Sequence, residues 1–164
     1  MPIIQISGFP GSGKTSYLLN SLIQHKGKSI FIDCECSLAT RNGISIPCDC
    51  DIYRVYTIHE LIAFIYGEYT SSYNALICID GLGSLIKGLS LPAIQITKIL
   101  AQLMMQLHKL THTYQLTVLI SNNLLPLKHP PYIVPSLGPV FSRYFNSHIC
   151  LNSEQFTALP HSIS

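Results

Sequence analysis

A glycine-rich run near the start of the chain has the residue types that bind phosphate. It fits the pattern G-x-x-x-x-G-K-[ST] in full and reads Gly8-Phe9-Pro10-Gly11-Ser12-Gly13-Lys14-Thr15. Its glycines let the backbone turn tightly, so that successive N–H groups point at an anion, and a helix that follows adds the positive end of its dipole. The run therefore predicts a nucleoside triphosphate site.

The residues that end the run have separate expected roles. Lys14 is expected to reach the β- and γ-phosphates as a point charge, and the Thr15 hydroxyl is expected to take one position on an octahedral Mg²⁺. Ser16, which follows directly, is counted with the run among the ATP-binding residues. A glycine-rich surface turn is the alternative, but it does not explain why Lys and Thr follow the glycines.

Two apolar segments further along the chain end in carboxylates. Ala75 to Asp80 reads as a buried parallel strand, and an acid at its carboxyl end can hold Mg²⁺ directly or through water. A turn-forming aspartate before Gly81 is the alternative. Phe31 to Glu35 has the same form, so Glu35 is either a base that orients the attacking water or part of a solvated acidic turn.

Helix and strand periods alternate along the chain. They predict an α/β fold, in which a mostly parallel sheet carries helices on both faces, as a single domain over 1–164. Thr57 and Glu60 have the spacing of a capping box, and Gly27 stands just past the first helix. The expected strands are Pro2 to Ile6, Ser29 to Asp33, Ile52 to Tyr56, Ala75 to Asp80, Leu116 to Ser121 and His148 to Leu151, and the expected helices are Ser16 to His25, Ile58 to Tyr66 and Ala93 to Thr113.

The composition is apolar for a chain of 164 residues, with 48% hydrophobic and 11% charged residues. The excess of apolar residues suggests a buried interface with a partner. No apolar run reaches the roughly 18 residues that a membrane span needs, so no membrane association is expected. Nothing near the N-terminus has the pattern of a secretory signal, and an intracellular location is therefore expected.

Four of the six cysteines form the pairs Cys34-Glu35-Cys36 and Cys48-Asp49-Cys50. Zinc ligands generally stand two to four residues apart, whereas only one residue separates these, so reduced thiols are expected and zinc is the alternative. His108 and His112 have a spacing that can hold a metal on a helix, but solvated side chains are preferred there. The aromatic residues Tyr132, Tyr144 and Phe145 are assigned to packing, with base stacking as the alternative.

Taken in order, the motifs resemble those of the RecA-like recombinase ATPases, and in particular the eukaryotic and archaeal recombinase paralogues of DNA repair. The resemblance spans nearly the whole chain. It is carried by Gly8 to Ser16, Phe31 to Glu35, Leu76-Ile77-Cys78-Ile79-Asp80-Gly81-Leu82-Gly83-Ser84-Leu85-Ile86, a helix with Gln102-Leu103 to Leu110, Val118-Leu119-Ile120-Ser121-Asn122-Asn123, and Pro135-Ser136-Leu137-Gly138-Pro139-Val140-Phe141-Ser142-Arg143.

The resemblance implies a RecA-like P-loop ATPase core with roles at matching positions. Lys14 and Thr15 would bind ATP and Mg²⁺, Glu35 would activate the attacking water, and Asp80 would be the Walker-B aspartate. Asn123 stands where the family has a glutamine that senses the γ-phosphate, and its side chain is one methylene shorter. The shorter side chain is expected to weaken the coupling of hydrolysis to DNA.

The resemblance also implies a biological role. The chain would be an accessory factor in homologous recombination and double-strand-break repair, a weak or DNA-dependent ATPase in the nucleus, or in the cytoplasm of a prokaryote. Its partners would be related paralogues and a recombinase, with single-stranded DNA bound only weakly at a net charge of +2. No helical domain or linker precedes Pro2, which favours a hetero-oligomer over a homofilament.

Two DNA-binding loops of the family have reduced counterparts in this sequence. Gly81 to Pro92 is short for the first loop, and Leu124 to Pro135, with Lys128 and His129, stands where the second would lie. Arg143 could contact phosphate or be a surface cation. A nucleotide-bound scaffold without turnover is the first alternative function. A P-loop small-molecule kinase is the second, but Arg41, Arg54 and Arg143 do not cluster as an arginine-rich lid would require.

Overall fold

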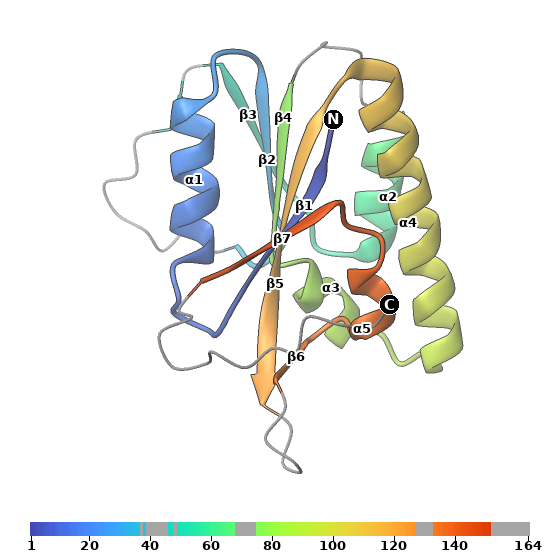
Figure 1. Ribbon diagram of the computed structural model, residues 1–164. Helices are drawn as coiled ribbons and strands as arrows, with labels where there is room; N and C mark the ends of the chain where they lie inside the picture. Colours follow the sequence, from blue (N-terminus) through green and yellow to red (C-terminus); the bar gives the residue numbers. More distant parts are fainter. Residues whose placement is uncertain (37, 39–45, 48, 68–74, 127–132, 152–164) are drawn as a thin grey trace.

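The computed structural model describes the chain except for residues 37, 39–45, 48, 68–74, 127–132 and 152–164 (Figure 1). Strands and helices alternate along most of the described part. The strands are β1 (Ile3–Gly8), β2 (Ser29–Asp33), β3 (Cys50–Arg54), β4 (Leu76–Asp80), β5 (Thr117–Pro126), β6 (Ile133–Pro135) and β7 (Ser147–Cys150). The helices are α1 (Lys14–Gln24), α2 (Ile58–Gly67), α3 (Leu82–Lys87), α4 (Ala93–Tyr114) and α5 (Pro139–Ser142).

Six of the strands form a central parallel sheet in the order β3-β2-β4-β5-β1-β7. The sheet has α1 on one face and α2 with α4 on the other (Figure 1). This arrangement confirms the predicted α/β class and the parallel sheet covered on both faces. The short strand β6 pairs antiparallel with the far end of β5.

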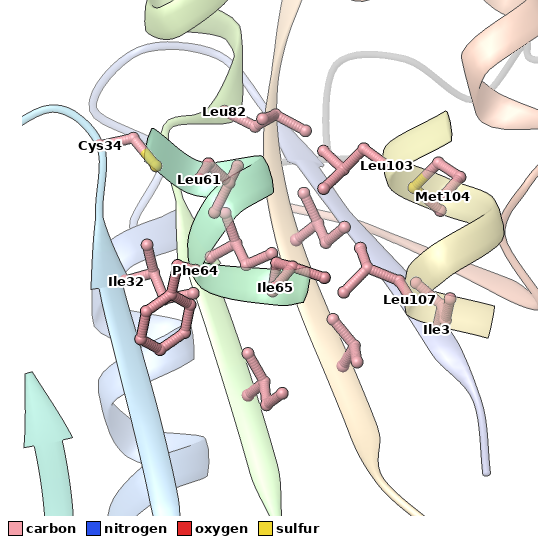
Figure 2. Packing of buried hydrophobic residues seen from close by; sticks show 14 of the residues in the cluster. Ile3, Ile32, Cys34, Leu61, Phe64, Ile65, Leu82, Leu103, Met104 and Leu107 are labelled. Atoms are coloured by element: carbon pink, nitrogen blue, oxygen red, sulfur yellow. The ribbon is translucent and has the colours of Figure 1, made fainter. Parts of the chain in front are cut away.

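Burial explains why the central strands are continuous apolar runs. Every residue of β2 and β4 is buried, as expected of parallel strands that are covered on both faces. Alternate side chains point to opposite faces, so β5 sends Val118 and Ile120 toward one core cluster and Leu119 toward the other. Figure 2 shows the larger cluster, in which Leu61 and Phe64 of α2 and Leu103 of α4 meet side chains from the strands.

The sequence missed three elements and misplaced the ends of several strands. Helix α3 lies in the segment read as a short loop, and β6 and α5 lie in the proline-rich region after Asn123. Strand β1 continues to Gly8, two residues past its predicted end. Strand β3 begins and ends two residues earlier than predicted. Strand β5 continues to Pro126, so Asn122 and Asn123 lie inside it and not after it, because its last residues gain the partner β6.

The two helix-boundary predictions had different outcomes. At the start of α2, the Glu60 N–H donates to Thr57 Oγ1 at 3.1 Å, and the Glu60 carboxylate accepts from the N–H of Tyr56 at 2.8 Å, which confirms a capping interaction. Helix α1 ends at Gln24, so Gly27 follows the helix as predicted. It does not form a left-handed cap, because the C-cap is His25 in an extended conformation and Gly27 is not among the glycines with positive φ.

Among the described residues, no helix combines the length and the apolar composition that crossing a membrane requires.

Candidate active site

The sheet order brings the carboxyl ends of four strands to one edge. Strand β5 lies between β1 and β4, and β2 lies beyond β4. In register, Gly8 pairs with Asn123 at the end of β1, and Asp33 pairs with Asp80 at the ends of β2 and β4. The glycine-rich run and the acids of distant segments therefore meet at this edge, which is where open parallel sheets bind ligands.

The loop between β1 and α1 has the backbone that its glycines predict. Gly11 and Gly13 have φ values of 81° and 89°, in the left-handed region where a side chain is disfavoured. The Ser12 N–H donates to the Phe9 carbonyl at 3.0 Å and closes a tight turn. Gly13 caps the N-terminus of α1, so the positive end of the helix dipole faces the loop.

Lys14 lies across this loop and is half-buried. Its Nζ donates to the Gly8 carbonyl at 2.9 Å and to the Phe9 carbonyl at 2.8 Å. Burial lowers the pKa of Lys14 below its ordinary value, while Asp80 and Glu35 act in the opposite direction. The ammonium group thus stands beside the loop that would receive phosphate, held by carbonyls that a phosphate oxygen could replace.

Thr15 and Asp80 are in direct contact although 65 positions separate them. Thr15 Oγ1 donates to Asp80 Oδ2 at 2.7 Å, and both side chains are buried. The other carboxylate oxygen of Asp80, Oδ1, accepts a hydrogen bond from Ser121 Oγ at 2.6 Å. The first turn of α1 and the end of β4 therefore present a hydroxyl and a carboxylate side by side, which are the oxygen ligands that Mg²⁺ prefers.

Glu35 follows β2 and extends over the start of α3. A Cβ at Gly81 would collide with the carbon atoms of the Glu35 side chain, so this close approach requires glycine there, and Gly81 also has a φ of 79°. Glu35 remains exposed at the rim, yet lost hydration in the pocket and then the charge of Asp80 raise its pKa above the ordinary value. Lys14 and Lys87 act in the opposite direction.

These groups enclose a pocket of about 300 Å³, at the lower end of the range for small-molecule sites. One wall comes from the glycine-rich loop and α1, through Pro10, Gly11, Gly13, Lys14, Thr15 and Ser16. The other comes from the strand ends and α3, through Glu35, Asp80, Gly81, Gly83, Ser121 and Asn123. The structure thus gathers the expected catalytic and metal residues in one cavity.

Three residues of the predicted ATP-binding set belong to the loop but do not line the pocket. Gly8 ends β1 and Phe9 begins the turn, and both offer carbonyls to Lys14. Ser12 lies against Gly8, where an added Cβ would collide with the Ser12 hydroxyl. These residues are outside the pocket lining, while their neighbours form it.

Asn122 and Asn123 point to opposite faces of the sheet. Asn123 lines the pocket. Asn122 is buried on the other face, where its Oδ1 accepts from Ser136 Oγ at 2.7 Å. Alternation along β5 separates the two amides.

Sequence reasoning did not assign Ser121, Gly81 or Gly83 to the site. Gly83 leaves little room for a side chain, since a Cβ there would stand 3.1 Å from Ser136 Oγ. Ser121 lies inside a motif that was noticed, but nothing local marks a serine as the partner of an aspartate 41 positions away. Only the strand register reveals it.

The described histidines and aromatic residues that the sequence singled out lie outside the pocket lining. His108 bonds the Tyr144 carbonyl through Nε2 at 2.8 Å, so the expectation of a solvated side chain was wrong for it, whereas His112 is exposed. Phe145 is buried in the core against Phe141, which confirms packing, and Tyr144 packs beside it. Tyr132, Lys128 and His129 lie outside the described residues.

None of the described arginines and cysteines is among the residues that line the pocket. Arg54 and Arg143 are exposed, and Arg41 lies outside the described residues. Cys34, Cys36, Cys50, Cys78 and Cys150 are free thiols. Within the part of the chain that the structure describes, which leaves out Cys48, no three His, Cys, Asp or Glu side chains group as a metal site would require.

Comparison of the sequence with protein-family models and with curated proteins gave no match.

Proposed function

We propose that this chain binds Mg²⁺·ATP in the pocket between the glycine-rich loop and the ends of β4 and β5. The single observation that carries the proposal is the 2.7 Å hydrogen bond from Thr15 Oγ1 to Asp80 Oδ2. It joins the last residue of the phosphate-binding motif to the acid of a strand that is not adjacent to β1. A glycine-rich turn without function would not need that partnership.

The donor groups fit the nucleotide and its metal. Backbone N–H groups at Gly11 and Gly13, the dipole of α1 and the Lys14 ammonium are suited to anionic phosphate. Thr15 and Asp80 would hold the metal by oxygen. When bound, Mg²⁺ neutralises charge that develops on the phosphate oxygens. Lys14 would exchange the carbonyls of Gly8 and Phe9 for phosphate oxygens.

Glu35 is the residue that we assign to hydrolysis. It stands at the rim of the pocket beside Asp80, with a raised pKa that moves its titration toward the pH at which a general base works best. In its ionised form it would accept a proton from water directed at the γ-phosphate. Asn123, on the neighbouring wall, would contact the phosphate end of the nucleotide.

We propose further that the chain is a RecA-like recombinase paralogue, an accessory factor in homologous recombination and double-strand-break repair. Support comes from the order of its motifs and from the convergence of four of them on one pocket, whose lining includes Asn123. On this proposal it works in the nucleus, within a complex of related paralogues and a recombinase, and contacts single-stranded DNA weakly.

A nucleotide-bound scaffold is the second candidate function. Asn123 favours it, because a side chain one methylene shorter than glutamine reaches less far toward a γ-phosphate. Helix α3, with 6 residues, also takes up half of the segment that would otherwise form the first DNA-binding loop. A scaffold would bind ATP tightly and release phosphate slowly or not at all.

Turnover of ATP by the purified chain separates the two functions. The experiment measures phosphate release with and without single-stranded DNA, in the wild type and in Lys14→Ala. Turnover that rises with DNA and disappears in Lys14→Ala is the expected result for a recombinase-type ATPase. Binding without turnover, again lost in Lys14→Ala, would assign the scaffold function.

The partner proposal is tested by affinity purification of the tagged chain from its own cells. Related ATPases and a recombinase are expected to come down with it, and Lys14→Ala is expected to weaken that association if nucleotide orders the interface. Recovery of the chain as a stable monomer without them would contradict the complex.

A further inference from the structure

We propose that Ser121 is a positioning residue that fixes the carboxylate of Asp80 for Mg²⁺. This inference rests on the proposed function and gives a role to a residue for which the motifs predicted none. Ser121 and Asp80 have exposed fractions of only 1% and 2%, so their contact is shielded from water. Ser121 belongs to β5, which lies between the strand that carries the glycine-rich loop and the strand that carries Asp80.

The direction of the hydrogen bonds follows from the donors present. The Gly81 N–H donates to Ser121 Oγ at 2.8 Å, and an N–H can act only as a donor. The single proton of the Ser121 hydroxyl is therefore available for Asp80 Oδ1, and the distance from Ser121 Oγ to Asp80 Oδ1 is 2.6 Å. The hydroxyl accepts on one side and donates on the other, so its orientation is defined.

Ser121 and Thr15 together hold both oxygens of the carboxylate. Thr15 Oγ1 donates to Oδ2 and Ser121 Oγ donates to Oδ1. The terminal torsion of an aspartate is intrinsically broad, so hydrogen bonds must define the plane of its carboxylate. Without Ser121, rotation about that torsion could carry Oδ1 and Oδ2 away from the positions that the metal requires.

The same hydroxyl also supports the turn under Glu35. Ser121 Oγ accepts a hydrogen bond from the N–H of Gly81, and the Glu35 side chain packs directly against Gly81. Ser121 therefore links the metal-binding acid to the support of the proposed base. Outer partners of metal ligands act in this way, and their loss typically lowers metal affinity about 10- to 100-fold.

The test is the Mg²⁺ dependence of binding of a fluorescent, non-hydrolysable ATP analogue. The wild type is expected to bind more tightly with Mg²⁺ than with a chelator. Ser121→Ala is expected to keep the affinity measured in chelator and to need about 10-fold more Mg²⁺ for half-maximal enhancement. Ser121→Thr, which keeps the hydroxyl, is expected to restore the midpoint to within about threefold.

Two further variants separate positioning from general stability. Ser29→Ala removes another buried serine hydroxyl at the opposite end of the sheet, and its Mg²⁺ midpoint is expected to equal that of the wild type. Ser121→Cys keeps the shape of the side chain but has only a weak donor. It is expected to fold and to show the raised Mg²⁺ midpoint predicted for Ser121→Ala, so it provides the test if the alanine variant does not fold.

The outcomes distinguish this inference from the proposed function. A wild type that fails to bind the analogue, or binds it without Mg²⁺ dependence, would overturn the proposed function and the role of Ser121 together. A wild type with Mg²⁺-dependent binding and an unchanged midpoint in Ser121→Ala or Ser121→Cys would overturn the role of Ser121 alone.

Discussion

At the scale of single residues, the two carboxylates of the pocket lie in different environments. Asp80 is buried and held by hydroxyls, which suits a fixed metal ligand, whereas Glu35 remains exposed at the rim, where water can reach it. The raised pKa of Glu35 means that the folded chain favours its protonated form more than the unfolded chain does.

Glu35→Gln tests the role of the proposed base. Turnover is expected to fall at least about 100-fold, the usual range for loss of a general base, while ATP binding stays within about threefold of the wild type. In the wild type, turnover is expected to fall as the pH drops through a pKa above the ordinary 4.5 of a glutamate. Unchanged hydrolysis in Glu35→Gln would remove Glu35 from this role.

The same variant gives a stability readout that does not need activity. Because the carboxyl pKa is raised on folding, Glu35 stabilises the fold below its unfolded pKa, and that contribution is lost as the pH rises through the folded pKa. Glu35→Gln is therefore expected to raise the Tm at pH 7, with the gain fading in acid. Thermal melts of the wild type and Glu35→Gln, at pH 7 and at a pH below the ordinary carboxyl pKa of 4.5, check this.

Gly81→Ala tests the close approach of Glu35 to the start of α3. The added Cβ would collide with Glu35 and would also force a left-handed residue to carry a side chain. We expect a loss of about 1–3 kcal/mol in the free energy of unfolding and a fall in turnover. Gly88→Ala is the matched control, since its φ is −77° and its Cβ would meet no atom within 4 Å, and its Tm is expected to match the wild type.

At the scale of elements, α3 is tied to the segment that carries Glu35. The Ser84 hydroxyl lies 2.9 Å from the Cys34 carbonyl and 2.6 Å from the Gly81 carbonyl, so it bridges α3 to the end of β2. A displacement of α3 would therefore move the residue before Glu35. This contact connects the segment after Asp80 with the proposed base.

Ser84→Ala tests that connection. Turnover is expected to fall about 10-fold because the base loses its alignment, while ATP affinity stays near the wild-type value. The control is Thr97→Ala, which removes a hydroxyl bound to a carbonyl within α4, away from the pocket. Equal turnover in the two variants, measured by phosphate release, would show that Ser84 does not act on Glu35.

The elements also show how far the sequence could predict this fold and site. The glycine-rich loop is local, so its motif predicted the tight turn and the helix after it. Helix α3 was missed because 6 residues are too few to show a helical period, and β6 because its pairing with β5 is not local. The role of Ser121 depends on the register of β5 between its neighbours, which no short pattern contains.

At the scale of the whole molecule, the parallel sheet is the scaffold of the site. Its order places β5 between β1 and β4, so the phosphate loop, Ser121, Asn123 and Asp80 reach one pocket from separate parts of the chain. Two hydrophobic clusters hold α1 on one face and α2 with α4 on the other (Figure 1). A ligand that binds this edge would therefore stabilise the fold as a whole.

The most direct test of the central claim is the Tm of the purified chain with Mg²⁺·ATP, compared between the wild type and Lys14→Ala. At a nucleotide concentration about 100 times the Kd, binding contributes about 2.7 kcal/mol, which corresponds to a rise of roughly 5–10 °C in a domain of this size. That rise is expected in the wild type, and its loss is expected in Lys14→Ala. An equal Tm with and without Mg²⁺·ATP in the wild type would contradict the central claim.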